Sequence, residues 1–375
     1  MQRNAGGYSG TVTDTFRTLF ISRKYPPSKG GMETAAVNLY ERLAEVRPVK
    51  LVKFGWSNKM LPVSMALLLV RGLWHAASRS TDVVVIQDGV LAPVGRIIGA
   101  LTRKPVVVII HGLEVTHTGS VHRALMRWSL PHAALLVAVS ENTKRLIAEQ
   151  YPTARVTVVP NGVSDEFYVE RSRAELDTAV AALAGLPVER VATSTILLTV
   201  GRLVPRKGVR WFTTNVIPSL PERFLYLVVG VGNERAGIEE AIVDASLADR
   251  VMLLGAVPGE GLLDIYNRAD VFVMPNVPVE ADVEGFGLVA LEASSTGTPV
   301  VASNIDGIPD AVRSPGNGVL VAAADAEAYE AAILAVDSSP EARARTRAFT
   351  LDNYSWAASA RGFDAALTSV TSTRR

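Results

Sequence analysis

Short apolar runs alternate with longer amphipathic stretches along most of the chain, and the whole alternation occurs twice. Apolar, β-branched runs bounded by turn residues predict strands that are covered on both faces, and the stretches between them predict crossover helices. In the first half the predicted strands are Thr18–Ser22, Val49–Phe54, Asp82–Gln87, Val106–Ile110, Leu135–Val139 and Val156–Val159. In the second half they are Ile196–Val200, Phe224–Val229, Val251–Leu254, Val271–Met274 and Val300–Ala302. The pattern therefore predicts an α/β protein with two doubly wound parallel sheets.

The length agrees with two domains, because 375 residues exceed one ordinary core and a domain typically takes about 150 residues. We expect a disordered lead over residues 1–16, which are rich in Gly, Ser, Thr and Asn and have no apolar block typical of a secretory signal. The first domain then spans 17–165, a polar linker 166–194, the second domain 195–353, and a final helical segment 354–375.

Composition narrows the class of protein. Hydrophobic residues make up 48% and charged residues 20% of the chain, yet no window approaches the roughly 18 to 20 uninterrupted apolar residues of a membrane span. Cysteine is absent, which excludes a disulfide framework, a thiol nucleophile and cysteine-ligated zinc. We therefore expect a folded enzyme with the cytoplasm as its default compartment.

The charge is distributed unevenly. Residues 1–165 hold 20 Lys and Arg against 10 Asp and Glu, whereas the remainder holds 18 against 27. Such a basic half is suited to an anionic partner, either a phospholipid surface or a phosphate-bearing acceptor. A solvated basic face that docks on the acidic second domain is the alternative. The basic residues on which this rests are Lys50, Lys53, Lys59, Arg71, Arg79, Arg96, Arg103 and Lys104.

The segment from Lys59 to Ser78 has an amphipathic pattern with Leu67, Leu68, Leu69 and Trp74. Such a helix either rests on a bilayer or packs on its own sheet, and we favour packing on the sheet. A peripheral contact with the inner face of an anionic membrane stays open as an alternative.

The segment Glu284 to Glu292, Glu-Gly-Phe-Gly-Leu-Val-Ala-Leu-Glu, is the most informative for chemistry. Gly285 and Gly287 allow the backbone to approach a ligand closely. The apolar run after them predicts a helix whose first N–H groups are free to bind an anion such as phosphate. Glu284 and Glu292 lie on either side of the predicted helix start, a placement suited to binding a sugar at one end and a ribose at the other.

Two other turns follow predicted strands, where ligands bind in doubly wound sheets. One ends in Gly30 and Gly31, and the other begins with Gly201 and Arg202 and continues to Lys207. Arg202 and Lys207 are able to converge on a diphosphate, although exposed turn cations are the usual fate of such residues. No Gly-x-Gly-x-x-Gly follows the first strand and no Walker loop is present, which argues against a nicotinamide dehydrogenase and a P-loop nucleotidase.

Histidines gather in one region. His111 follows a strongly apolar strand, and His117, His122 and His132 lie within the next 21 residues. Their spacing matches no metalloprotease pair and no carboxylate–His ligand set, so we predict no metal site. Asp282 is left without a role.

Taken in order, these motifs resemble a known family. They are Gly30-Gly31-Met32-Glu33, His111-Gly112, Val139-Ser140-Glu141, Pro160-Asn161-Gly162-Val163, Gly201-Arg202 with Lys207-Gly208, and the Glu284–Glu292 segment followed by Thr296-Gly297-Thr298-Pro299. The series resembles the retaining glycosyltransferases of the GT-B fold, group 1 or family 4. This resemblance covers nearly the whole chain from Arg17 onward and implies two Rossmann-like domains that face each other across a cleft.

The resemblance also implies roles. Arg202 and Lys207, with Gly201 beside them, would hold the donor diphosphate; Glu284 would bind the transferred sugar, Glu292 the ribose, and His111 would lie beside the sugar. The glycines Gly30 and Gly31 and the backbone of Gly285, Phe286, Gly287 and Leu288 would approach the diphosphate. The implied reaction moves a sugar from a UDP- or GDP-sugar to a hydroxyl acceptor, a glycolipid or cell-envelope glycan precursor, with retention and without a metal or other cofactor.

Retention in this family is expected from attack on the same face as the leaving phosphate, so no residue is nominated as nucleophile. Two other hypotheses stay open: a GT-B nucleotide-sugar epimerase or hydrolase, and a two-lobed small-molecule binding protein without catalysis. No nucleic-acid partner is expected. The sequence does not identify the base, the sugar, the acceptor or the oligomeric state.

Overall fold

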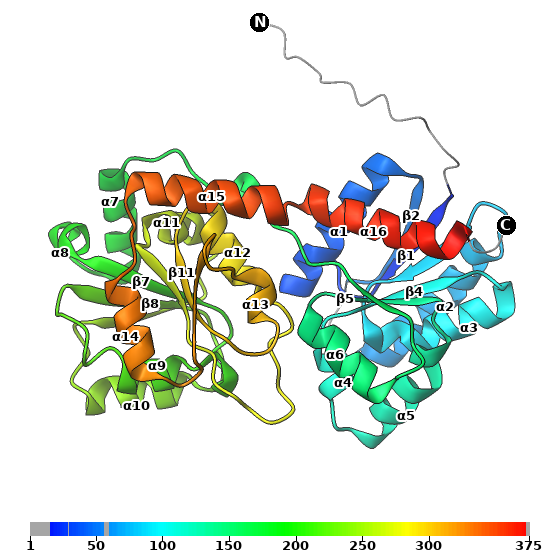
Figure 1. Cartoon of the computed structure of the whole chain (residues 1–375), viewed down its shortest axis with the longest axis horizontal. Coiled ribbons are helices and arrows are strands. Elements are labelled where there is room, and N and C mark those ends of the chain that lie inside the picture. The colour runs from blue at the N-terminus through cyan, green and yellow to red at the C-terminus, as the bar shows by residue number, and fades with distance from the viewer. Residues whose placement is uncertain (1–15, 29, 56–59, 373–375) are drawn as a thin grey trace, which may run out of the picture.

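The protein contains two parallel sheets, each with helices packed around it (Figure 1). The computed structural model describes residues 16–28, 30–55 and 60–372. The expected disordered lead, apart from Phe16, lies outside the described residues, as does Lys59. In the described part of the chain, no helix is both long and apolar enough to cross a bilayer.

The first sheet has the strand order β2-β1-β3-β4-β5-β6, and every neighbouring pair is parallel. Its strands are β1 (Thr18–Ser22), β2 (Val49–Lys53), β3 (Val83–Ile86), β4 (Val106–Ile110), β5 (Leu135–Ala138) and β6 (Val156–Val158). Its helices are α1 (Gly31–Val46), α2 (Leu61–Ala76), α3 (Ala92–Thr102), α4 (Leu113–Thr116), α5 (Ser120–Ser129) and α6 (Glu141–Gln150). The central strands β1, β3 and β4 are buried along their whole length, which explains their continuous apolar sequence.

The second sheet has the order β12-β11-β10-β7-β8-β9, again parallel throughout. Its strands are β7 (Thr195–Val200), β8 (Phe224–Val229), β9 (Val251–Gly255), β10 (Val271–Met274), β11 (Val300–Ser303) and β12 (Gly318–Val321). Its helices include α9 (Val209–Asn215), α10 (Arg235–Asp244), α11 (Glu260–Arg268), α12 (Leu288–Ser295), α13 (Ile308–Ala311) and α14 (Ala326–Leu334). β12 was not predicted from the sequence, because this edge strand is only partly buried and lacks a continuous apolar run.

The segment 166–194, expected to be a linker, is instead part of the second domain. It forms α7 (Arg173–Ala184) and α8 (Val188–Thr193), and α7 packs on α11. Val180, Ala181 and Val191 are buried in the same cluster as strands of the second sheet. The polar composition that suggested a linker belongs to the exposed face of α7, whose N-terminus carries a capping box between Ser172 and Glu175.

Two helices at the end of the chain span both domains. α15 (Pro340–Tyr354) packs on α12. α16 (Trp356–Thr371), red in Figure 1, packs on α1 and β5 of the first domain. Trp356 is buried against Gly162, where a Cβ would lie 2.6 Å from the tryptophan backbone. The Ser359 hydroxyl donates a hydrogen bond to the Pro160 carbonyl at 2.7 Å, and Arg47 of the first domain pairs with Asp364.

The carboxyl ends of the two sheets face each other. The loop after β4 meets the segment after β10, because a Cβ on Gly285 would overlap the carbonyl oxygen of His111. A Cβ on Gly31, at the start of α1, would lie 3.3 Å from the Leu288 side chain. The backbone N–H of Glu141, after β5, donates to Asp310 at 3.1 Å. Loops that follow strands in both domains therefore meet, as expected for ligand sites in doubly wound sheets.

α2 packs on strands β1 and β2 of its own sheet, as we favoured, and leaves part of its apolar surface exposed. The face it turns to the protein carries mainly small residues, Ser64, Gly72 and Ala76 with Leu68, while Leu67 and Trp74 point outward. A Cβ on Gly72 would lie 2.6 Å from Ile98 of α3, so the small residues allow close helix contact. Met65, Leu69 and Leu73 are partly buried against the same cluster as Leu68, so the expected packing of this helix on its own sheet is confirmed, although Trp74 is 79% exposed.

Trp356→Ala should destabilise the protein by about 3–5 kcal/mol, because it removes a large buried side chain and leaves a cavity between α16 and the first sheet. Urea unfolding followed by circular dichroism measures the change. Trp74→Ala is the matched control, and as a surface change it should shift the free energy of unfolding by no more than about 0.5 kcal/mol. Equal effects of the two substitutions would contradict the packing of α16.

Candidate active site

A buried cluster of two cations and one carboxylate lies at the carboxyl end of β7. The turn after this strand contains a short 3-10 helix, Pro205–Lys207, which places Arg206 and Lys207 in the interior. Lys207 Nζ donates to Glu284 Oε2 at 2.6 Å, and Arg206 Nη1 pairs with the same oxygen. Asn276 Nδ2 donates to it as well, at 3.2 Å. Oε1 of Glu284 accepts no hydrogen bond from the described residues, so this oxygen is available to a ligand.

Glycines make this turn possible. Gly208 has a left-handed backbone with φ 66°, and a Cβ there would overlap the carbonyl oxygen of Pro275 after β10. The backbone N–H of Val277 donates to the Arg206 carbonyl at 3.0 Å. On the other side, the Lys207 chain runs beside Gly201, where a Cβ would lie 3.5 Å from its Cε. The turn is therefore held tightly against the end of β10.

The Glu284 backbone is fixed by the loop after β11. Its N–H donates to Asp306 Oδ2 at 2.9 Å, and its carbonyl accepts from the Gly307 N–H at 3.0 Å. Gly287 then takes a left-handed conformation, with φ 104°, directly before α12 begins at Leu288. The first turn of α12 thus opens beside Glu284, and its unpaired N–H groups provide an anion-binding position.

Electrostatics keep Glu284 charged. Burial alone opposes ionisation, but the positive charges of Lys207 and Arg206 outweigh it and lower the pKa of Glu284 to about 2. Arg206 also pairs through Nε with Asp282 Oδ1 at 2.9 Å. Asp282, which the sequence left without a role, therefore helps to neutralise Arg206.

Glu292 lies close enough to the cluster for the charge of Lys207 to act on it. It is the fifth residue of α12, a little more than one turn from its start. The Tyr266 hydroxyl donates to its Oε2 at 2.7 Å. Burial raises the pKa of Glu292, while the nearby charge of Lys207 acts in the opposite direction. Lys207 therefore interacts electrostatically with both carboxylates of the Glu284–Glu292 segment.

His111 approaches from the first domain. Its Nε2 lies 3.0 Å from the Gln87 carbonyl oxygen, which only accepts, so this nitrogen carries the hydrogen. When the ring is neutral, Nδ1 is left as an acceptor. The backbone N–H of His111 donates a hydrogen bond to Glu114 Oε2 at 3.1 Å. Its neighbours His117 and His122 make an edge-on ring contact, and within the described ranges no group of three or more His, Asp or Glu residues is placed to hold a metal ion.

The glycine turn of the first domain is close to α12 but has a carboxylate of its own. A Cβ on Gly30 would lie 2.7 Å from Glu33 Oε2, and the other oxygen of Glu33 pairs with Lys24 at 3.2 Å. Gly31 opens α1 next to Leu288. An anion at this turn would therefore lie near the balanced Lys24–Glu33 pair.

The structure brings together most of the residues singled out from the sequence. Lys207, Glu284 and Glu292 are joined through contacts or charge, Gly201 lies beside Lys207, and His111 meets Gly285 across the domains. Phe286 is a packing residue, buried near Tyr354, so only its backbone is available to a ligand.

Arg202 and Arg206 lie in different surroundings. The Arg202 side chain is exposed and makes no hydrogen bond or ion pair with any residue the structure describes, while Arg206 fills the buried position next to Lys207. Sequence reasoning missed Arg206, Asn276 and Asp306. The only signal for Arg206 was its place beside Lys207, and nothing in the sequence marked it as buried.

Comparison with known proteins identifies the family. The model of Glycosyltransferase Family 4 matches residues 33–167, and that of Glycosyl transferases group 1 matches residues 194–338. The chain belongs to the group-1 glycosyltransferases. Its fold is GT-B: HepE from Anabaena, solved in complex with UDP, superposes with a TM-score of 0.72 over 94% of this chain and all of that one, at 18% identity. Sucrose-phosphate synthase from Thermosynechococcus elongatus reaches 0.75 over 95% of this chain and 100% of its own, at 19% identity.

Characterised sequences also resemble this glycosyltransferase. The GDP-mannose-dependent alpha-(1-6)-phosphatidylinositol monomannoside mannosyltransferase of Mycolicibacterium smegmatis is 27% identical in an alignment that covers 90% of this chain and 94% of that protein. The 2-deoxystreptamine glucosyltransferase of Streptomyces kanamyceticus is 32% identical over 203 residues, covering 53% of this chain and 50% of that protein.

The depressed pKa of Glu284 makes a testable contribution to stability. A carboxylate whose folded pKa is lowered stabilises the protein above its unfolded pKa, and this contribution is lost as the pH falls toward the folded value. The stability difference between the parent and Glu284→Gln should therefore narrow by about 1 kcal/mol or more between about pH 6 and about pH 3.5.

Urea unfolding of both proteins at the two pH values measures this difference. Glu239→Gln, which removes an exposed helical partner of Arg235, is the control and should show no comparable narrowing. A difference for Glu284→Gln that stays constant with pH would contradict the ionised, cation-paired carboxylate.

Proposed function

We propose that this glycosyltransferase moves a sugar from a UDP- or GDP-sugar to a hydroxyl acceptor with retention of anomeric configuration. The observation that carries the proposal is the buried Arg206–Lys207–Glu284 cluster beside the first turn of α12, facing the first domain. Lys207 of this cluster and the free helix N–H groups suit a diphosphate, whose negative charge grows as the bond to the sugar breaks.

In this proposal Lys207 and Arg202 hold the diphosphate. Lys207 is already desolvated and oriented, while Arg202 is exposed and free to turn toward a ligand, with its charge close enough to affect Lys207. Glu284 offers its unoccupied Oε1 to hydroxyls of the sugar, because its other oxygen is held by three donors. Glu292 accepts hydrogen bonds from the ribose.

The electrostatics of Glu284 support attack on the same face. A carboxylate with a pKa of about 2 is stabilised by its cations and is therefore a weak base and a weak nucleophile. A double displacement through Glu284 is disfavoured on this ground. The departing phosphate oxygen instead takes the proton of the acceptor hydroxyl as that hydroxyl attacks, and no metal is required for this step.

Supporting evidence for a nucleotide-sugar donor comes from the names of similar proteins. The Mycolicibacterium smegmatis relative is named for GDP-mannose, and structures of Anabaena HepE contain UDP and UDP-glucose. These names favour a hexose but point to different bases. Incubation with UDP-, GDP- and ADP-sugars, with nucleotide release as the readout, selects among them, and release without any acceptor product would indicate a hydrolase or epimerase instead.

We further propose that the acceptor is lipid-linked and that the first domain contacts an anionic membrane. The outer face of α2 exposes Val63, Leu67, Val70 and Trp74, spaced along one side of the helix. α5 exposes Val121, Leu125 and Trp128, and α3 packs between these two helices.

Basic residues accompany this apolar face. Arg71, Arg79, Arg123 and Arg127 are all exposed on or beside α2 and α5, and the first half of the chain carries the excess of positive charge. Apolar side chains that enter the lipid boundary, with Arg near anionic head groups, are typical of a peripheral membrane face. The phosphatidylinositol-linked acceptor in the name of the mycobacterial relative agrees with this.

Lys207→Ala and Glu284→Ala should each lower kcat/KM for donor turnover by about 100-fold or more, since each removes a charge that acts on the reacting diphosphate or sugar. Nucleotide release in the presence of acceptor measures the effect. Arg210→Ala is the matched control, because this exposed arginine on α9 pairs with the exposed Glu240 at 3.4 Å, away from the Glu284 cluster. Near-parental turnover in both site variants would remove the proposed roles.

Trp74→Ala should weaken binding to vesicles that contain phosphatidylglycerol, because an exposed tryptophan loses its place at the lipid boundary. Flotation with and without salt measures recovery, and added salt should reduce it. Val243→Ala, which trims an exposed apolar residue of α10 in the second domain, should leave recovery unchanged. Equal recovery on neutral phosphatidylcholine vesicles would contradict an electrostatic membrane contact.

A further inference from the structure

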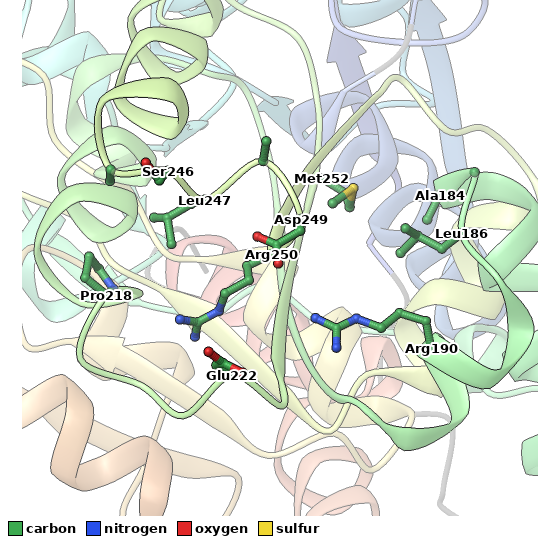
Figure 2. A pocket seen from close by; sticks show the side chains of 13 residues that line it. Ala184, Leu186, Arg190, Pro218, Glu222, Ser246, Leu247, Asp249, Arg250 and Met252 are labelled. Carbon is green, nitrogen blue, oxygen red and sulfur yellow. The ribbon is translucent and has the colours of Figure 1, made fainter.

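A pocket lies in the second domain, away from the cluster around Glu284. It has a volume of about 660 Å³ and is formed by the end of α7, the start of α8, the loop before β8 and the connection from α10 to β9 (Figure 2). All these segments precede strands, so the pocket lies at the amino ends of β7, β8 and β9. Lys207 and Glu284 follow strands, and the sheet therefore separates the two places.

Two arginines converge on this pocket. Arg250 lies directly before β9 and is 9% exposed; its Nη2 donates to the carbonyls of Leu220 at 2.9 Å and Pro221 at 3.1 Å. Arg190 reaches toward it from α8, on the opposite wall (Figure 2). The positive charge of Arg190 is close enough to lower the pKa of Arg250, a shift caused mainly by burial.

Neither arginine has an ion-pair partner within the described residues. Glu222 and Asp249 are the carboxylates that line the pocket; both are exposed, and their charges raise the pKa of Arg250 more than Arg190 lowers it, but neither forms an ion pair with it. Two like charges that meet in a partly buried pocket repel one another unless an anion lies between them. The local charge distribution is therefore complementary to a negative group placed between the two guanidinium groups.

We propose that this pocket binds a small organic phosphate, such as a sugar phosphate, at a site separate from that of the nucleotide-sugar. Guanidinium groups match phosphate oxygens through paired N–H donors, which argues for phosphate as the recognised group. The volume is much larger than inorganic phosphate needs and falls within the range of about 300–1,000 Å³ that is usual for small-molecule sites.

The remaining walls account for the body of the ligand. Leu186, Leu247 and Met252 provide an apolar side against which a sugar ring can lie, and Glu222 and Asp249 at the rim can accept hydrogen bonds from its hydroxyls. A hydroxyl-bearing molecule with one phosphate thus fits the pocket better than either a bare anion or an uncharged sugar.

Isothermal titration of the full chain with glucose 6-phosphate tests the proposal, with saturating UDP and GDP present so that the nucleotide site is filled. We expect binding in this mixture, weaker binding of inorganic phosphate, and none of glucose. Arg190→Gln should weaken glucose 6-phosphate binding about tenfold or more, because it removes a charge-assisted contact to the phosphate. Thermal unfolding confirms that the variant is folded.

Arg223→Gln is the matched control, since Arg223 is an exposed neighbour of Glu222 that does not line the pocket. Its binding should equal that of the parent, and nucleotide binding and turnover should be unchanged in Arg190→Gln. No glucose 6-phosphate binding at millimolar concentration, equal weakening by both substitutions, or displacement of the sugar phosphate by nucleotide would each overturn the proposal. If the parent protein does not turn over any nucleotide-sugar, the proposed function is refuted, but the proposal of this sugar-phosphate site is not affected.

Discussion

Glu284 is the carboxylate around which the second domain builds its site. Two cations, Arg206 and Lys207, are buried after β7, and their burial would be costly without an opposite charge in contact. Glu284 supplies that charge and is itself fixed by backbone hydrogen bonds to the loop after β11. The ion pairs and backbone hydrogen bonds of Glu284 therefore connect the three loops that follow β7, β10 and β11. The same pairing keeps Glu284 ionised and leaves one of its oxygens without a partner.

Glycine contacts decide how the first domain meets this site. At Gly285 there is no room for a Cβ beside the His111 carbonyl, and at Gly31 the start of α1 touches Leu288. Backbone from one domain can therefore reach within contact distance of the helix start in the other. α16 reinforces this arrangement, because it leaves the second domain after α15 and packs on α1 and β5 (Figure 1). The site thus depends on a crossing helix distant from it in sequence.

Different surfaces of the molecule have different chemistry. The carboxyl end of the second sheet carries the paired charges of the candidate site, Arg206 and Lys207 with Glu284. The outer face of α2 presents apolar side chains to solvent because its inner face uses small residues to approach α3. The amino ends of β7, β8 and β9 carry two arginines without ion-pair partners within the described residues. Doubly wound sheets permit this separation, since their opposite ends are closed by different sets of loops.

The sequence by itself determined the strands that are buried on both faces, the two-sheet architecture and the motifs that identify the family. It did so because full burial demands continuous apolar runs, and because turns after strands need glycine at fixed places. The edge strand β12 and the helices α7 and α8 were missed, since partial exposure leaves their sequences mixed.

Only the tertiary structure decided which charges are buried and which face of a helix meets water. Arg202 and Arg206 are both turn arginines in sequence, yet one is exposed and the other pairs with Glu284 and Asp282. Likewise, Leu67 and Leu68 are adjacent leucines, but only Leu68 faces the protein. These outcomes depend on partners brought together from distant parts of the chain, and no local pattern of residues encodes them.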